Sequence, residues 1–212
     1  MDYYQPLIAG EKYHIVSRAT GSEKLFTEPE NYRFFLQRFD KYILPVATVF
    51  AYALLPNHFH FLIEIKPYDQ LFELYKSKKQ HLKAAQIPVK ADDYRQPEFV
   101  MQHFSNLLNS YTKSFNKKYN RKGALFMDYL RRVQIKTDEQ FFATLFYIHK
   151  NPVHHGICKD IAGWGWSSYN SILTNDSTKI ERERVIDFFQ SAEQFIAFHN
   201  QPVHLKNAVV VE

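Results

Sequence analysis

The hydrophobic positions of this chain follow two periods, and together they predict an α+β fold. Four stretches alternate apolar with polar residues or are rich in β-branched and aromatic ones, as strands are: residues 11–19, 46–55, 58–65 and 124–135. Four others have helical patterns: residues 28–43, 68–83, 98–119 and 137–151. The last helix should stop near Asn151, because Pro152 disfavours helical geometry at the residue before it.

The order of these elements favours a ferredoxin-like architecture. The Pro56-Asn57 turn joins the second and third strands into a hairpin, and helices connect the other strands. We therefore predict one domain over residues 1–175, a ferredoxin-like antiparallel sheet with helices. It carries an insertion at about residues 68–97, with a loop over 84–97. A C-terminal helical extension and tail should follow over residues 176–212, with one or two helices between 179 and 200.

The composition narrows the class of protein without defining its function. Hydrophobic residues make up 45% of the 212 residues, which is enough for a sizeable core. Cys158 is the sole cysteine, so a disulfide framework or a cysteine-rich zinc site within one chain is excluded. The N-terminus lacks a signal-peptide pattern, and no run approaches the roughly 18 apolar residues of a membrane span. We therefore expect a soluble cytoplasmic protein with no membrane partner.

The third predicted strand begins with a His-x-His motif. His58 and His60 should project from one face of this strand, and Phe59 and Phe61 from the other. Two neutral imidazoles on one face can chelate a single divalent cation. The alternative at this point is a pair of structural histidines in an aromatic-rich strand.

Tyr147 and Asn151 lie four residues apart near the end of the fourth predicted helix. This spacing puts them on one helical face, with Ala143 and Thr144 one turn earlier. The pattern predicts that Tyr147 sits on a small polar surface, away from the apolar stripe of the helix. A structural or surface role for this tyrosine is the alternative.

Basic residues gather in the segment from Lys113 to Lys136. Asp128 is the only acidic residue there, and aromatic residues such as Tyr129 are interleaved with the cations. Basic groups with nearby aromatics suit phosphate contacts and base stacking on single-stranded nucleic acid. A solvated basic face above core aromatics is the alternative.

Three motifs together resemble the single-tyrosine HUH transposases. They are residues 56–62 around His-x-His, residues 115–126 in the basic segment, and residues 147–156 around the tyrosine. The last motif is most similar to the REP-associated tyrosine transposases, and the likeness covers roughly residues 8–172. The resemblance implies an HUH endonuclease core in the 1–175 domain. It also implies Tyr147 as nucleophile, with His58, His60 and Asn151 as ligands of a divalent metal ion, Mg²⁺ or Mn²⁺.

The same resemblance implies an activity and a partner. The protein would be a metal-dependent single-stranded DNA endonuclease and strand transferase, cutting next to DNA hairpins through a 5′-phosphotyrosine intermediate. It would act as a nucleoid-associated monomer rather than a dimer, on single-stranded or hairpin DNA. The expected DNA-binding residues are Arg18, Lys113, Lys117, Lys118, Arg121, Lys122, Arg131 and Arg132.

Two other functions fit the sequence. A non-catalytic binder of structured DNA or RNA would need only the basic segment and the fold. A metal-dependent hydrolase would use the histidine pair and a bound water, and it would form no covalent adduct with DNA.

Overall fold

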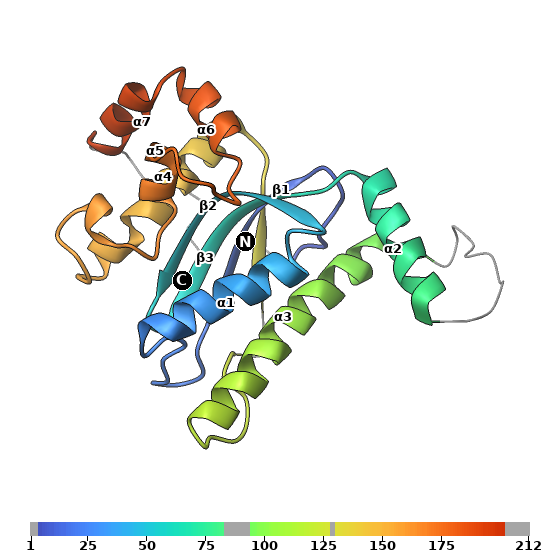
Figure 1. Ribbon diagram of the computed structural model, residues 1–212. Helices are drawn as coiled ribbons and strands as arrows, with labels where there is room; N and C mark the ends of the chain where they lie inside the picture. The colour runs from blue at the N-terminus through green and yellow to red at the C-terminus, as the bar shows by residue number, and fades with distance from the viewer. Residues whose placement is uncertain (1–3, 83–93, 128–129, 202–212) are drawn as a thin grey trace.

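The computed structural model describes residues 4–82, 94–127 and 130–201 (Figure 1). Most of the predicted loop at 84–97, the predicted tail after Gln201, and both Asp128 and Tyr129 lie outside the described residues. Within the described part of the chain, no helix is long and apolar enough to cross a membrane.

The four strands form one antiparallel sheet of order β2-β3-β1-β4. The strands are β1 (Lys12–Arg18), β2 (Ala47–Leu55), β3 (His58–Ile65) and β4 (Arg131–Ile135). Helix α1 (Pro29–Tyr42) connects β1 to β2, whereas α2 (Tyr68–Leu82) and α3 (Gln96–Lys118) lie between β3 and β4. This strand order with helical crossovers is the ferredoxin-like fold that the sequence predicts.

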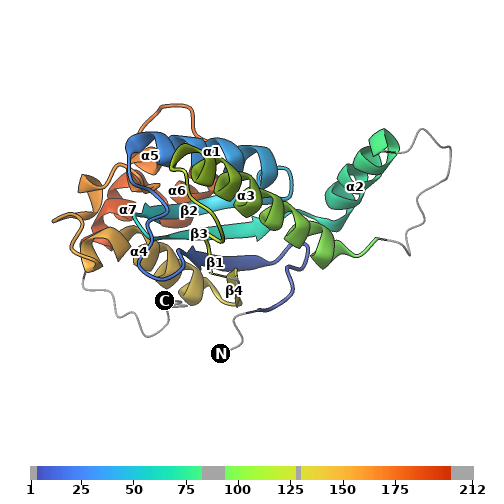
Figure 2. The ribbon, with the colours of Figure 1, turned by 90° about the horizontal axis from the view of Figure 1, so that it is seen from below.

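One face of the sheet is covered by α1 and α3, and the interface is rich in aromatic rings (Figure 2). Phe39 of α1 stacks on Phe61 of β3, with ring centroids 4.1 Å apart. Tyr111 of α3 is buried and donates a hydrogen bond to the carbonyl of Leu25. The apolar side of the His-x-His strand therefore lies in this core, which turns the histidines toward the other face.

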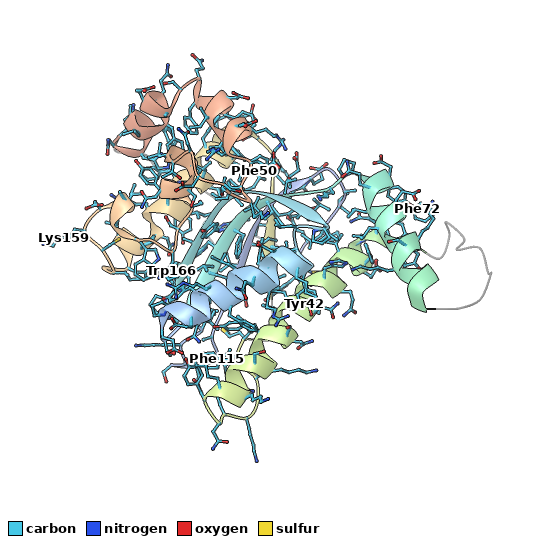
Figure 3. All side chains as sticks on the ribbon, in the orientation of Figure 1. Tyr42, Phe50, Phe72, Phe115, Lys159 and Trp166 are labelled. Atoms are coloured by element: carbon cyan, nitrogen blue, oxygen red, sulfur yellow. The ribbon has the colours of Figure 1, made fainter. Side chains whose placement is uncertain are left out.

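The other face is covered by α4 (Asp138–His154), and the elements that follow α4 pack beside it and along the outer edge of β2 (Figure 2). These elements are a 3₁₀ turn (Ile161–Gly163), α5 (Tyr169–Leu173), α6 (Arg182–Phe189) and α7 (Ala192–His199). Phe50 of β2 is fully buried on this side, below α6 (Figure 3). The predicted C-terminal extension thus packs against the rest of the chain. Its residues Ile180, Val185 and Phe195 join Phe50 in the apolar cluster on this side of the sheet, here called the second apolar cluster.

Three predicted boundaries differ from the structure. The fourth strand is confined to Arg131–Ile135, and α3 already begins at Gln96, with Pro97 in its first turn, where a missing N–H is tolerated. Helix α4 continues through Pro152 to His154. A proline there removes only one helical hydrogen bond, and the N–H of His155 still donates to Asn151 O at 3.0 Å.

Two buried histidines connect α4 to α7. The distance from His149 Nδ1 to His199 Nε2 is 2.9 Å, and His149 Nε2 lies 2.7 Å from Ser168 Oγ. Burial lowers the pKa of His199 to about 4 and also lowers that of His149. Both imidazoles are therefore neutral in the folded protein at neutral pH.

This pair predicts that the free energy of unfolding falls in mild acid. The unfolded His199 has an ordinary pKa of about 6.5, so between pH 6.5 and 4 the unfolded state binds more protons. The stabilisation is complete above pH 6.5 and is lost as the pH falls toward 4, by roughly 2 kcal/mol at pH 5 for this residue alone. Urea unfolding at pH 7.5 and 5 measures the difference, and equal values at both pH values would contradict the prediction.

Candidate active site

The two histidines of the His-x-His motif project from β3 toward α4. Their ring centroids are 5.0 Å apart, and the backbone pairing sets Arg18 of β1 opposite His58 and Val16 opposite His60. His58 is partly exposed, whereas His60 is only 1% exposed. The motif thus runs from the edge of the molecule into its interior.

Helix α4 brings Tyr147 and Asn151 to these histidines. The ring of Tyr147 meets that of His60 edge-on, with centroids 5.6 Å apart, and Asn151 Oδ1 lies 3.2 Å from His58 Nε2. The Tyr147 side chain is 4% exposed and Asn151 is fully buried. All four sequence-predicted residues of the site therefore lie together, although 86 residues or more separate the two motifs in the chain.

The predicted polar surface around Tyr147 is wrong. Tyr147 belongs to the second apolar cluster, together with Val16, Leu62 and Leu145. The prediction assumed that α4 has one apolar face and one exposed face. The sheet covers one side of this helix, and the C-terminal helices cover another, so little of it meets solvent.

Burial sets the charge state of the histidines. It lowers the pKa of His58 to about 4 and that of His60 well below its ordinary value, and the neighbouring histidines reinforce the shift of His60. Both rings are therefore neutral near pH 7. A neutral imidazole keeps a lone pair on one nitrogen, which is the form that ligates a divalent cation.

His60 Nε2 and Asn151 Nδ2 are both buried, and neither atom makes a hydrogen bond within the described part of the chain. Buried polar atoms are nearly always partnered, so the His60 nitrogen is a candidate ligand position. The described residues contain no group of three or more His, Cys, Asp or Glu side chains suited to a metal ion. A three-ligand protein site here would therefore need the amide of Asn151 beside His58 and His60, a donor set that suits a divalent cation.

Two further histidines border the site, and sequence reasoning assigned them no role. His14 of β1 is fully buried, and its Nε2 lies 3.0 Å from His60 Nδ1. His155 follows α4, and its ring centroid is 4.9 Å from that of His58. His155 lies four residues after Asn151, and this helical spacing could have shown that it lies near the site. The position of His14 near the site follows only from the pairing of β1 with β3.

The predicted DNA-binding residues fall into two groups. Five have exposed side chains, at the end of β1, on α3 and in the loop after it: Arg18, Lys113, Lys117, Lys118 and Lys122. The N–H of Ala19 donates to Asn57 O at 2.7 Å, and that of Thr20 donates to Leu125 O at 3.0 Å. These bonds hold the end of β1 and the chain at Leu125 beside the turn that precedes His58.

Several members of the basic segment, the exposed Lys118 among them, already have partners within the chain. Arg121 donates to the carbonyl of Ala124 and pairs with Glu23 at 3.0 Å. Arg132 donates to the carbonyls of Gln5 and Tyr4, and Lys118 pairs with Glu28. Arg131 lies on β4 and is partly buried. Arg121 and Arg132, two of the predicted DNA-binding residues, thus hold a loop and the N-terminal segment in place.

The sheet order and the helical crossovers define a ferredoxin-like α+β protein with a histidine, tyrosine and asparagine cluster under one face. The fold is similar to that of a solved REP-associated tyrosine transposase bound to a REP hairpin, with a TM-score of 0.56. The two chains are 13% identical, and the likeness covers 86% of this chain and 96% of the other. No family model and no curated protein matches the chain. The resemblance stated from the motifs is therefore confirmed at the level of the fold.

Proposed function

We propose that the protein binds hairpin-bearing single-stranded DNA and cuts it with Tyr147 as the nucleophile. The observation that carries this proposal is the convergence of Tyr147 and Asn151 on His58 and His60. It is supported by a fold shared with a transposase that was solved bound to a REP hairpin. The test is incubation with such DNA and Mg²⁺ or Mn²⁺, followed by a search for a protein–DNA adduct that survives denaturation.

The proposed reaction is a transesterification. The phenol oxygen of Tyr147 attacks phosphorus and loses its proton, while the bond from phosphorus to the 3′-oxygen breaks and that oxygen gains a proton. The products are a 5′-phosphotyrosine and a free 3′-hydroxyl, with no water consumed. Because the phosphoester bond is retained on the protein, a DNA hydroxyl can later reverse the step and join strands.

The surrounding residues have distinct tasks in this proposal. His58, His60 and Asn151 would hold a divalent ion, which neutralises charge at a bound phosphate. The edge-on contact with His60 orients the Tyr147 ring. Because Tyr147 is 4% exposed, DNA binding must open the surface above it before the phenol oxygen can reach phosphorus.

The burial of Tyr147 favours a second candidate function, the binding of structured DNA or RNA without cleavage. A binder of structured DNA or RNA that performs no cleavage would not need an accessible phenol. A protein of this kind would bind hairpin DNA as the proposed nuclease would, but it would form no adduct in the presence of Mg²⁺ or Mn²⁺. A hydrolase that uses bound water would cut DNA, again without an adduct.

We also propose that the monomer is the active form. Tyr147 and both histidines of a single chain are in contact, so no second copy is needed to complete the site. Light scattering of the protein with and without hairpin DNA tests this proposal, and a stable dimer with exchanged helices would contradict it.

The exposed lysines near α3 should contribute affinity that weakens with salt. Replacing both Lys117 and Lys122 by alanine removes two cations, and it should leave the ion pairs of Lys118 and Arg121 in place. The slope of log affinity against log salt should become shallower by about 0.7 for each phosphate of a single strand that is no longer neutralised. Fluorescence anisotropy with labelled hairpin DNA at several salt concentrations measures this slope.

Lys159→Ala is the matched control, because this exposed lysine lies on the loop after α4, well apart from Phe115 and the end of α3 (Figure 3). Its salt slope should equal that of the unaltered protein. A double variant at Lys117 and Lys122 with an unchanged slope would show that this surface does not meet DNA.

A further inference from the structure

His14 lies directly behind the proposed metal ligand His60. It belongs to β1, is fully buried, and stacks on His60 with ring centroids 5.2 Å apart and an interplanar angle of 28°. Its Nε2 lies 3.0 Å from His60 Nδ1. The His14 ring also meets Tyr147 edge-on, with centroids 5.9 Å apart. This one side chain therefore contacts both the proposed ligand and the proposed nucleophile.

The contact between the two imidazoles determines which ring nitrogen of His60 carries its proton. Both rings are in a buried site, so each is neutral and carries one N–H. If His14 Nε2 carries the proton and donates, then His60 Nδ1 accepts it, and the proton of His60 must sit on Nε2. If His60 Nδ1 donates to His14, the lone pair of His60 sits on Nε2. Only the second arrangement leaves the otherwise unpartnered Nε2 able to bind a cation.

We infer that His14 is a positioning residue that accepts the Nδ1–H of His60 and so presents the Nε2 lone pair of His60 to a divalent cation. The inference rests on the proposed function for its purpose. The tautomer itself is a property of the metal-free protein. Metal-ligating histidines generally donate their second ring N–H to an acceptor, which fixes tautomer and ring orientation. Such an acceptor is usually a carboxylate, a carbonyl or water, and here a second imidazole occupies that place.

The first test reads the tautomer without metal. In ¹⁵N NMR spectra of the metal-free protein, His60 should be protonated on Nδ1. His14→Gln can place an amide oxygen near the original Nε2 and should retain this tautomer. His14→Met has a similar length without a strong acceptor, and it should yield a mixture of both tautomers. A His60 ring protonated on Nε2 in the unaltered protein would overturn the inference, whatever the variants do.

The second test measures cation affinity, with Co²⁺ as a spectroscopic probe. The unaltered protein and His14→Gln should bind Co²⁺ with dissociation constants within about threefold of each other. His14→Met should bind roughly 10- to 100-fold more weakly, the usual effect of losing such a partner. Equal binding by His14→Met would overturn the inference.

His199→Met is the matched control, because His199 belongs to the other buried histidine pair, with His149. It should lose stability as His14→Met does and keep Co²⁺ affinity. A similar loss of affinity in this control would assign the His14 effect to general destabilisation. An unaltered protein that does not bind Co²⁺ would contradict the proposed metal site, and the NMR result would still decide the role of His14.

Discussion

Replacing Tyr147 by phenylalanine is expected to abolish the covalent protein–DNA adduct while leaving hairpin binding unchanged. The substitution keeps the ring that packs against His60 and His14, so the free energy of unfolding should change by only about 1 kcal/mol. It removes the one oxygen that the proposed reaction uses as nucleophile. Denaturing gels of protein incubated with labelled hairpin DNA and Mn²⁺ measure the adduct, and anisotropy measures binding.

Tyr169→Phe is the control for this experiment. Tyr169, on α5, is another buried tyrosine of the same apolar cluster. Removal of its hydroxyl should leave the amount of covalent adduct equal to that formed by the unaltered protein. Digestion of the adduct should place the nucleotide on the peptide that contains Tyr147.

A nucleotide on Tyr111 or Tyr119 would show that the nucleophile belongs to a different helix from α4. The structure already gives both hydroxyl groups other partners. Tyr111 donates to the carbonyl of Leu25, and Tyr119 donates to Glu28 Oε1.

Removing the metal or one of its proposed ligands is expected to have the second large effect. Excess chelator should reduce cleavage of hairpin DNA by the unaltered protein by on the order of a hundredfold or more, because the charge at the phosphate is then no longer neutralised. His58→Ala should have the same effect. His58 is partly exposed, so this change disturbs the core less than the loss of His60, which is 1% exposed.

His154→Ala is the matched control, since His154 is an exposed histidine at the end of α4 and is not a proposed ligand. It should cleave at the rate of the unaltered protein. Added Mg²⁺ or Mn²⁺ should restore activity to the chelated protein. Full cleavage in excess chelator would remove the metal ion from the mechanism.

Local sequence pattern was sufficient for much of the fold. Alternation in β3 requires that Phe59 and Phe61 face one core and that His58 and His60 face the other, as the structure has them. The order of the elements around the Pro56-Asn57 hairpin was enough to predict the antiparallel sheet with its helical crossovers. These features depend on neighbours in the chain, and a periodic pattern reports them directly.

The boundaries of the elements depend on local energies that tertiary packing can override. Pro152 was expected to stop α4 near Asn151, yet the helix continues for three more residues, to His154, and both Asn151 and Pro152 are buried there. The free energy lost with one helical hydrogen bond is small compared with the free energy gained by burying these side chains.

The interior of the site was decided by tertiary structure. The pairing of β1 with β3 puts His14 against His60, and no spacing within either strand contains that contact. Tyr147 is buried because its ring packs against His14 of β1 and His60 of β3, contacts that a single helix pattern cannot report. Arg121 and Arg132 donate to backbone carbonyls. Every residue has such a carbonyl, so no residue type in the sequence marks these partners. The sequence by itself determined which way each side chain points from its own element, and the packing of distant elements decided what each one meets.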